Sequence, residues 1–121
     1  MYCKHLLTKS LACIMAVMLL TTTAFSGNHG VRDNRDEAIN VAMKMREPLL
    51  NGNLSETERL GAQAIEFTER ALSEEKDGDV KKFLEGAISY LKATLEYARK
   101  DDFNRAGEAW GIALKRLSLS Y

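Results

Sequence analysis

The spacing of apolar residues from Asp33 onward constrains the fold of this chain more than any other feature. Apolar residues recur there at intervals of three and four rather than two, and the stretch contains a single proline, Pro48. Intervals of three and four place side chains on one face of an α-helix, whereas a strand repeats every two residues. The sequence therefore predicts an all-α protein.

Three polar turns divide this helical stretch: NGN at 51–53, KDGD at 76–79 and KDD at 100–102. The predicted helices lie at about 33–50, 54–75, 79–99 and 102–118. Connections this short make each helix reverse directly onto the one before it. We therefore predict an up-down-up-down four-helix bundle.

Each predicted helix begins near a residue that can accept hydrogen bonds from the free amides of the first turn. These residues are Asp33, Asn53, Asp79 and Asp102. Ser55 and Glu58 have the spacing of a capping box. Because Pro48 lies where the first helix should be ending, we expect it to kink or fray the last turn rather than divide the helix.

The apolar stripe of each helix predicts the core. Its many alanines indicate closely spaced and nearly antiparallel helices. The predicted core residues are Ala38, Ala42, Met45, Leu60, Ala64, Phe67, Ala71, Val80, Leu84, Ala87, Leu91, Ala98, Phe103, Ala106, Trp110, Ala113 and Leu117.

The helical stretch also shows an internal repeat. A shift of 49 residues aligns Val31 with Val80, Leu54 with Phe103, and the turn sequence GNL with DDF. This alignment indicates a duplicated helical hairpin.

The first thirty residues differ in composition from the rest. Basic residues stand at Lys4 and Lys9, and LACIMAVMLL at 11–20 is an uncharged apolar run. The run is too short to cross the roughly 30 Å hydrocarbon core of a membrane. Small residues in TTTAFSG at 21–27 then offer a site for signal peptidase. These features predict a secretory signal.

We place the signal peptide at 1–26, a flexible tail at 27–32 and the bundle at 33–121, with cleavage after Ser26 or, alternatively, after Ala24. The mature protein is expected to be soluble, without a membrane anchor, in the periplasm or secreted. Both cysteines, Cys3 and Cys13, lie in the signal. Stability must therefore come from packing rather than from disulfides.

The charges of the mature part are mixed along its length. Loss of Lys4 and Lys9 leaves 15 basic and 17 acidic side chains. No basic stripe is available to neutralise phosphates, which argues against nucleic acid as a partner.

The amino terminus of the mature chain is the sharpest candidate for chemistry. Cleavage after Ser26 would expose Gly27, Asn28 and His29, with histidine at the third position. The terminal amine, two amides and the imidazole can then surround one ion in a plane, which suits Cu(II) or Ni(II). Cleavage elsewhere would leave His29 as an ordinary residue of the tail.

A second candidate is an aromatic stripe at intervals of seven on the third helix, formed by Phe83, Tyr90 and Tyr97. The stripe could line a groove for a ligand or partner, although such stripes more often seal the seam between two helices. Met43 and Met45 point in different directions on a helix, so we expect one to pack in the core and the other to lie at the edge.

No catalytic arrangement is evident. The paired carboxylates are Glu66/Glu69, Glu74/Glu75, Asp77/Asp79 and Asp101/Asp102, and no histidine follows His29. A di-iron bundle needs histidine three residues after glutamate on two helices, and hydrolytic serine or cysteine needs a basic partner. We expect a protein that is not an enzyme.

The segments EAINVAMKM at 37–45, NGNLSETERLGAQAIEF at 51–67 and AISYLKATLEYARKDDFNRAGEAWGIALKRL at 87–117 resemble the small metal-binding proteins of the SmbP type. The resemblance covers nearly all of the mature part. It implies an exported four-helix bundle that binds divalent transition metals through many histidines.

This chain departs from the family pattern at the ligand positions. At the positions where the family repeats histidine, this chain has Val41, Leu60, Phe67, Tyr90, Tyr97, Ala109 and Arg116, with Asn53 and Asp102 at the turns. Only His29, Asp102 and nearby carboxylates could contribute metal ligands. The rhythm of EYARKDDFNRAGEAWGIAL is also similar to a tetratricopeptide hairpin, although a solenoid needs about three such repeats.

Two functions follow as hypotheses. The first is a periplasmic protein that binds or buffers a divalent metal ion, and the second is a bundle without metal ligands that acts as a structural or protein-interaction module. The expected partner is accordingly a metal ion or another protein, with the chain a monomer or a weak homo-oligomer. Fold alone does not separate these hypotheses.

Overall fold

The computed structural model describes residues 31–121, and these residues are folded into helices with no strand among them. The helices are α2 (Val31–Lys44), α3 (Arg46–Asn51), α4 (Leu54–Glu74), α5 (Gly78–Arg99) and α6 (Phe103–Leu119). The prediction of an all-α protein is confirmed. The predicted signal peptide at 1–26 and most of the tail at 27–32 lie outside the described residues.

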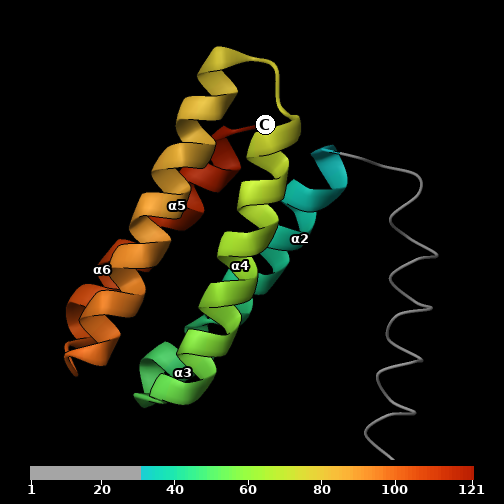
Figure 1. Cartoon of the computed structure of the whole chain (residues 1–121). Coiled ribbons are helices and arrows are strands. Elements are labelled where there is room, and N and C mark those ends of the chain that lie inside the picture. Colours follow the sequence, from blue (N-terminus) through green and yellow to red (C-terminus); the bar gives the residue numbers. More distant parts are fainter. Residues whose placement is uncertain (1–30) are drawn as a thin grey trace, which may run out of the picture. The chain divides into compact units, whose positions relative to one another are not determined.

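The four long helices run alternately up and down around a shared core (Figure 1). Helix α2 packs on α4, α4 on α5 and α5 on α6, and a smaller contact between α2 and α6 closes the ring. The short helix α3 turns the chain from α2 into α4 and also touches α6. This arrangement is the predicted up-down-up-down four-helix bundle.

The first arm of the bundle is divided, which corrects the prediction for Pro48. Helix α2 ends at Lys44, and α3 begins at Arg46. Proline has no N–H for the carbonyl four residues earlier, and its ring crowds that carbonyl, so the helix is disturbed upstream at Lys44. Met45 bridges the break with a tighter bond, in which its N–H donates to the carbonyl of Ala42 at 3.1 Å.

The two turns related by the 49-residue shift have the same backbone structure. Gly52 and Asp101 both adopt left-handed backbone, with φ of 68° and 63°. The next residue in each turn donates its N–H to a carbonyl five positions earlier, Asn53 to Pro48 at 2.8 Å and Asp102 to Tyr97 at 2.9 Å. The repeat seen in the sequence is therefore present in the structure at the two turns that join the arms of the helical hairpins.

The same two turns also cap the helices that follow them. The side chain of Asn53 accepts from the N–H of Glu56 at 3.2 Å, and that of Asp102 accepts from the N–H of Arg105 at 3.2 Å. Both caps were predicted. The capping box predicted at Ser55 is wrong, because α4 already begins at Leu54 with Asn53 as its cap.

Two other predicted caps are also corrected. Helix α5 begins at Gly78, and its cap is Asp77, whose side chain accepts from the N–H of Asp79 at 2.8 Å and of Val80 at 3.3 Å. Helix α2 begins at Val31, two residues before Asp33, so Asp33 lies inside the helix. A turn with several acidic residues offers competing caps, and spacing alone does not choose among them.

The core follows the predicted stripe. Thirteen of its members are at most 6% exposed, while Phe67, Val80, Phe103 and Trp110 are partly buried against them. The prediction missed Val41, Leu49, Leu95 and Ala109, which are also buried.

Three buried threonines were missed as well. Thr57, Thr68 and Thr94 are 0% exposed. Each hydroxyl donates to the carbonyl four residues earlier, at 2.7, 2.6 and 2.7 Å respectively. A helix thus satisfies the only polar group of the side chain locally, so that threonine can fill a core position.

Polar contacts close the ring between α2 and α6. The indole N–H of Trp110 donates to the carbonyl of Ala42 at 2.6 Å. At the other end of the seam, Arg35 donates to the carbonyl of Ser120 and lies over the ring of Tyr121, 4.6 Å from its centre. These contacts join helices that lie farthest apart along the sequence.

Candidate functional site

The amino-terminal metal candidate, Gly27, Asn28 and His29, lies outside the described residues. Within residues 31–121, no group of three or more histidine, cysteine, aspartate or glutamate side chains is placed so as to hold a metal ion.

The positions at which the SmbP-type resemblance expects histidines divide into two kinds. Val41, Leu60 and Ala109 are buried and belong to the apolar interior. Tyr90 and Arg116 instead lie near the surface, where they contact each other. The prediction for the two methionines is confirmed, since Met45 is 0% exposed and Met43 is 58% exposed.

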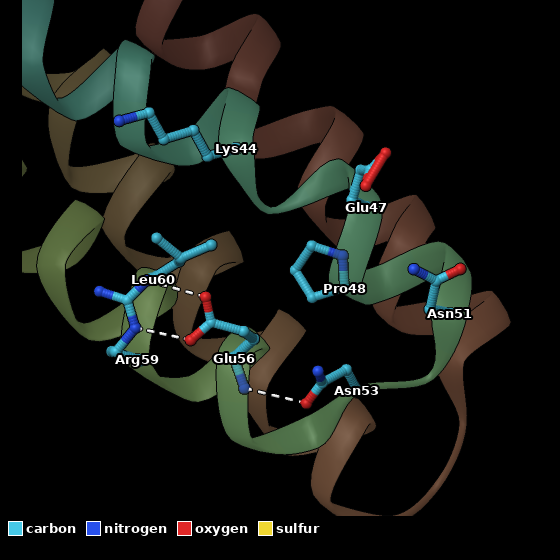
Figure 2. A pocket seen from close by; sticks show the side chains of 8 residues that line it. All are labelled: Lys44, Glu47, Pro48, Asn51, Asn53, Glu56, Arg59 and Leu60. Atoms are coloured by element: carbon cyan, nitrogen blue, oxygen red, sulfur yellow. Dashed lines mark hydrogen bonds and ion pairs between the residues drawn. The ribbon is translucent and has the colours of Figure 1, made fainter.

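A hollow lies at the corner between α3 and α4, with a volume of about 460 Å³ (Figure 2). Pro48 and Leu60 form its apolar part. Its polar side chains are Lys44, Glu47, Asn51, Asn53, Glu56 and Arg59. This hollow was not predicted, because the break at Met45, next to the corner, was not predicted either.

An ion pair occupies one side of the hollow. Arg59 binds Glu56 with two hydrogen bonds, Nε to Oε1 at 2.6 Å and Nη2 to Oε2 at 2.8 Å (Figure 2). The hydrogen bond from Arg59 lowers the pKa of Glu56, and the same contact raises the pKa of Arg59. A general acid at neutral pH needs a raised carboxyl pKa, so this pair is suited to a structural role rather than to proton transfer.

The predicted aromatic stripe lies on one side of α5. Phe83, Tyr90 and Tyr97 are all half-buried, and Tyr90 and Tyr97 pack against the core. The guanidinium of Arg116 on α6 lies over the ring of Tyr90, 5.6 Å from its centre. Tyr90 therefore lies at the seam between α5 and α6, and Phe83 and Tyr97 stand on the same side of α5 by their spacing.

Arg116 crosses this seam above Gly86. A Cβ atom built on Gly86 would lie 2.8 Å from Nη1 of Arg116 and 3.6 Å from its Cδ and Cζ. The missing side chain at Gly86 thus makes room for the guanidinium. The spacing within α5 predicts the aromatic stripe but not the place of Arg116 beside it, because a contact between α5 and α6 is not visible in the spacing within either helix.

Two apolar side chains extend this surface on α6. Ile112 stands four residues before Arg116 and Leu119 three residues after it, a spacing that places all three on one side of the helix. Ile112 is 39% exposed and Leu119 is 50% exposed. We call the surface formed by Phe83, Gly86, Tyr90, Tyr97, Ile112, Arg116 and Leu119 the α5–α6 face.

No protein-family model matches this chain, and searches of curated proteins and of solved structures give no match either. Among residues 31–121, no helix combines the length and the apolar character needed to cross a membrane. The fold and site described above define a small helical bundle with a mixed aromatic and cationic face.

Proposed function

We propose that this protein is a small exported binding protein whose bundle acts as a protein-interaction module through the α5–α6 face. One observation carries the proposal: Arg116 on α6 lies over the half-buried ring of Tyr90, and Ile112 and Leu119, on the same side of α6 by their spacing, are 39% and 50% exposed. Such a grouping of apolar and aromatic side chains, with an arginine among them, has the composition of a binding surface.

Burial of this face would release water from the exposed parts of two aliphatic side chains and three rings. Each square ångström of apolar surface removed from water contributes roughly 25 cal/mol. Aromatic rings add contact area at a low cost in conformational entropy. A partner that covers the seam would gain from both effects without any rearrangement of the core.

Photo-crosslinking tests this proposal. A photoreactive amino acid is placed at Ile112 in the exported protein, with the same group at Met43 as the matched control, because Met43 is also exposed, at 58%, but lies on α2. We expect a discrete protein adduct from position 112, and loss of this adduct when Leu119→Glu is added. Equal adducts from both positions, or none from position 112, would contradict the proposal.

A second candidate function is the binding or buffering of a divalent metal ion in the periplasm. Its support is the resemblance to the SmbP type together with the nitrogen donors that Gly27, Asn28 and His29 would offer after cleavage behind Ser26. Cu(II) and Ni(II) are the ions that favour four nitrogens in a plane.

The metal candidate is tested on the exported protein. Its intact mass identifies the first residue, and a titration with Cu(II) alone is followed by the visible absorption band. A start at Gly27 and one bound equivalent, lost in His29→Ala, would support the candidate. A different start or the same binding by His29→Ala would remove it, and neither result affects the proposal for the α5–α6 face.

A further inference from the structure

Arg116, the cation at the centre of the α5–α6 face, lacks an anionic partner within the described residues. Four other arginines form ion pairs with carboxylates: Arg59 with Glu56, Arg70 with Glu66, Arg99 with Glu58 and Arg105 with Asp102. Arg116 forms no such pair within residues 31–121, although it is half-buried and those four arginines are exposed.

The surroundings of Arg116 favour an anion at this point. Burial removes part of the hydration of a guanidinium, and an unpaired charge gains more from a carboxylate there than in open water. Gly86 leaves room for the guanidinium beside α5, and the ring of Tyr90 contacts it across the seam. This contact restricts the side chain of Arg116, and such restriction lowers the entropy cost of binding a ligand.

Further cations stand on the same side of α5. Lys82 lies four residues before Gly86 and Lys100 fourteen residues after it, a spacing that returns to the same side of the helix. Neither lysine forms an ion pair within the described residues. By the same spacing, carboxylates stand near these positions: Glu85 three residues after Lys82, Glu96 four residues before Lys100 and Glu108 four residues before Ile112. The charge around the face is therefore mixed, and Arg116 is the cation at its centre.

We propose that the α5–α6 face binds an acidic amphipathic segment of a partner protein, with a carboxylate on Arg116 and apolar side chains against Ile112 and Leu119. This inference rests on the proposed interaction function and specifies the chemistry of the partner. The complementarity is of two kinds, since the face offers the half-buried guanidinium of Arg116 at its centre and the aliphatic side chains of Ile112 and Leu119 on either side of it along α6. An apolar partner without carboxylates would leave Arg116 covered and unpaired, at a cost in affinity.

A synthetic helical peptide with glutamate and leucine on one face is the probe for this inference, and its glutamine analogue is the matched control. Binding to the mature protein is followed by two-dimensional NMR. We expect shifts concentrated at Gly86, Tyr90 and Ile112, and an affinity that falls as salt is added. Equal binding of the glutamine peptide would overturn the inference.

Two arginine variants sharpen the test. Arg116→Gln is expected to bind the glutamate peptide about tenfold less tightly, whereas Arg116→Lys keeps the charge and should lose less. Arg59→Gln removes an arginine outside the face and should bind as the parent does. An unchanged affinity in Arg116→Gln, with its thermal unfolding unchanged, would show that Arg116 holds no carboxylate.

Other occupants give distinct results. Binding to vesicles that contain phosphatidylglycerol, without binding of the peptide, would assign the face to an anionic membrane surface and contradict the inference. Concentration-dependent dimers that Arg116→Gln abolishes would assign it to a second copy of the chain. An adduct from position 112 that Arg116→Gln leaves unchanged would retain the interaction function and reject only the acidic partner.

Discussion

Gly52 and Asp101 occupy equivalent turns in the two hairpins, yet they do not meet the backbone requirement equally well. Both have left-handed backbone, with φ of 68° and 63°. Glycine adopts this region freely, whereas a residue with a side chain is strained there, aspartate less so than most. The second hairpin therefore carries a small strain that the first does not.

The variant Asp101→Gly should stabilise the protein by about 0.5–1 kcal/mol, because the strain at φ of 63° is relieved. At the equivalent position of the other turn, Gly52→Ala should lower the free energy of unfolding by about 1–2 kcal/mol, because alanine is strained in left-handed backbone. The free energies of unfolding in urea give both values. A loss of stability in Asp101→Gly would indicate that the aspartate side chain holds the turn by a contact of its own.

Gly61 is required for a different reason, the close approach of α4 and α5. A Cβ built at Gly61 would lie 2.6 Å from Cδ2 of Leu95. We expect Gly61→Ala to destabilise the bundle by about 1–3 kcal/mol, since a packed core resists added volume. Gly111 on α6 is the matched control, because a Cβ there meets nothing within 4 Å.

The control should change stability in the opposite direction. Gly111→Ala replaces a poor helix former by a good one without a clash, so a gain of up to about 1 kcal/mol is expected in the same urea experiment. Similar losses at both positions would mean that helix propensity and packing are not separable here.

The ion pair between Glu56 and Arg59 predicts a shifted titration. The pKa of Glu56 lies below its ordinary value of 4.5 because Arg59 donates a hydrogen bond to the carboxylate. A lowered folded-state pKa means that the pair adds stability above the unfolded-state pKa and loses it as the pH falls through the folded-state value. NMR titration of the Glu56 carboxyl should show a midpoint that rises towards 4.5 in Arg59→Gln.

At the scale of whole helices, the seam between α2 and α6 depends on few contacts. The indole of Trp110 donates to the carbonyl of Ala42 at 2.6 Å, beside the break between α2 and α3. Trp110 thus links α6 to the part of α2 where Pro48 weakens the regular hydrogen bonds.

Trp110→Phe keeps most of the apolar ring and removes the donor. The expected loss is about 1–2 kcal/mol, because a partly buried hydrogen bond is broken and some volume is lost. Urea unfolding followed by circular dichroism measures it. Ile112→Ala, two residues farther along α6 at a position 39% exposed, should stay within about 0.5 kcal/mol of the parent. If the two variants behave alike, the indole contact does not hold the seam.

The helices and their order were predictable because the signals for them are local. Intervals of three and four residues identified the helical faces, and Asn53 and Asp102 marked two starts correctly. The division at Met45 was missed because the effect of Pro48 was placed at its own position rather than at the carbonyl four residues earlier.

The candidate site was only partly predictable. The spacing of seven residues predicts that Phe83, Tyr90 and Tyr97 lie on the same side of one helix. Arg116 joins them only because α6 lies next to α5 and Gly86 leaves space for the guanidinium. Both the packing of α6 against α5 and the space above Gly86 depend on two helices together. The periodicity within one helix therefore could not have predicted that Arg116 is part of the face.

At the scale of the whole molecule, the closing seam brings residues from the two ends of the bundle together. Asp36, near the start of α2, accepts a hydrogen bond from the hydroxyl of Tyr121. We therefore expect the order in which the helices follow one another along the chain to be separable from their arrangement in space. A chain rearranged to begin at Gly78, with a short flexible linker from Tyr121 to Val31 and an end at Glu74, should rebuild the same ring of helices. Such a permuted protein should unfold in one cooperative transition with the parent's near-ultraviolet signal from Trp110, whereas a gradual transition would mean that the connection at 75–77 is itself needed for assembly.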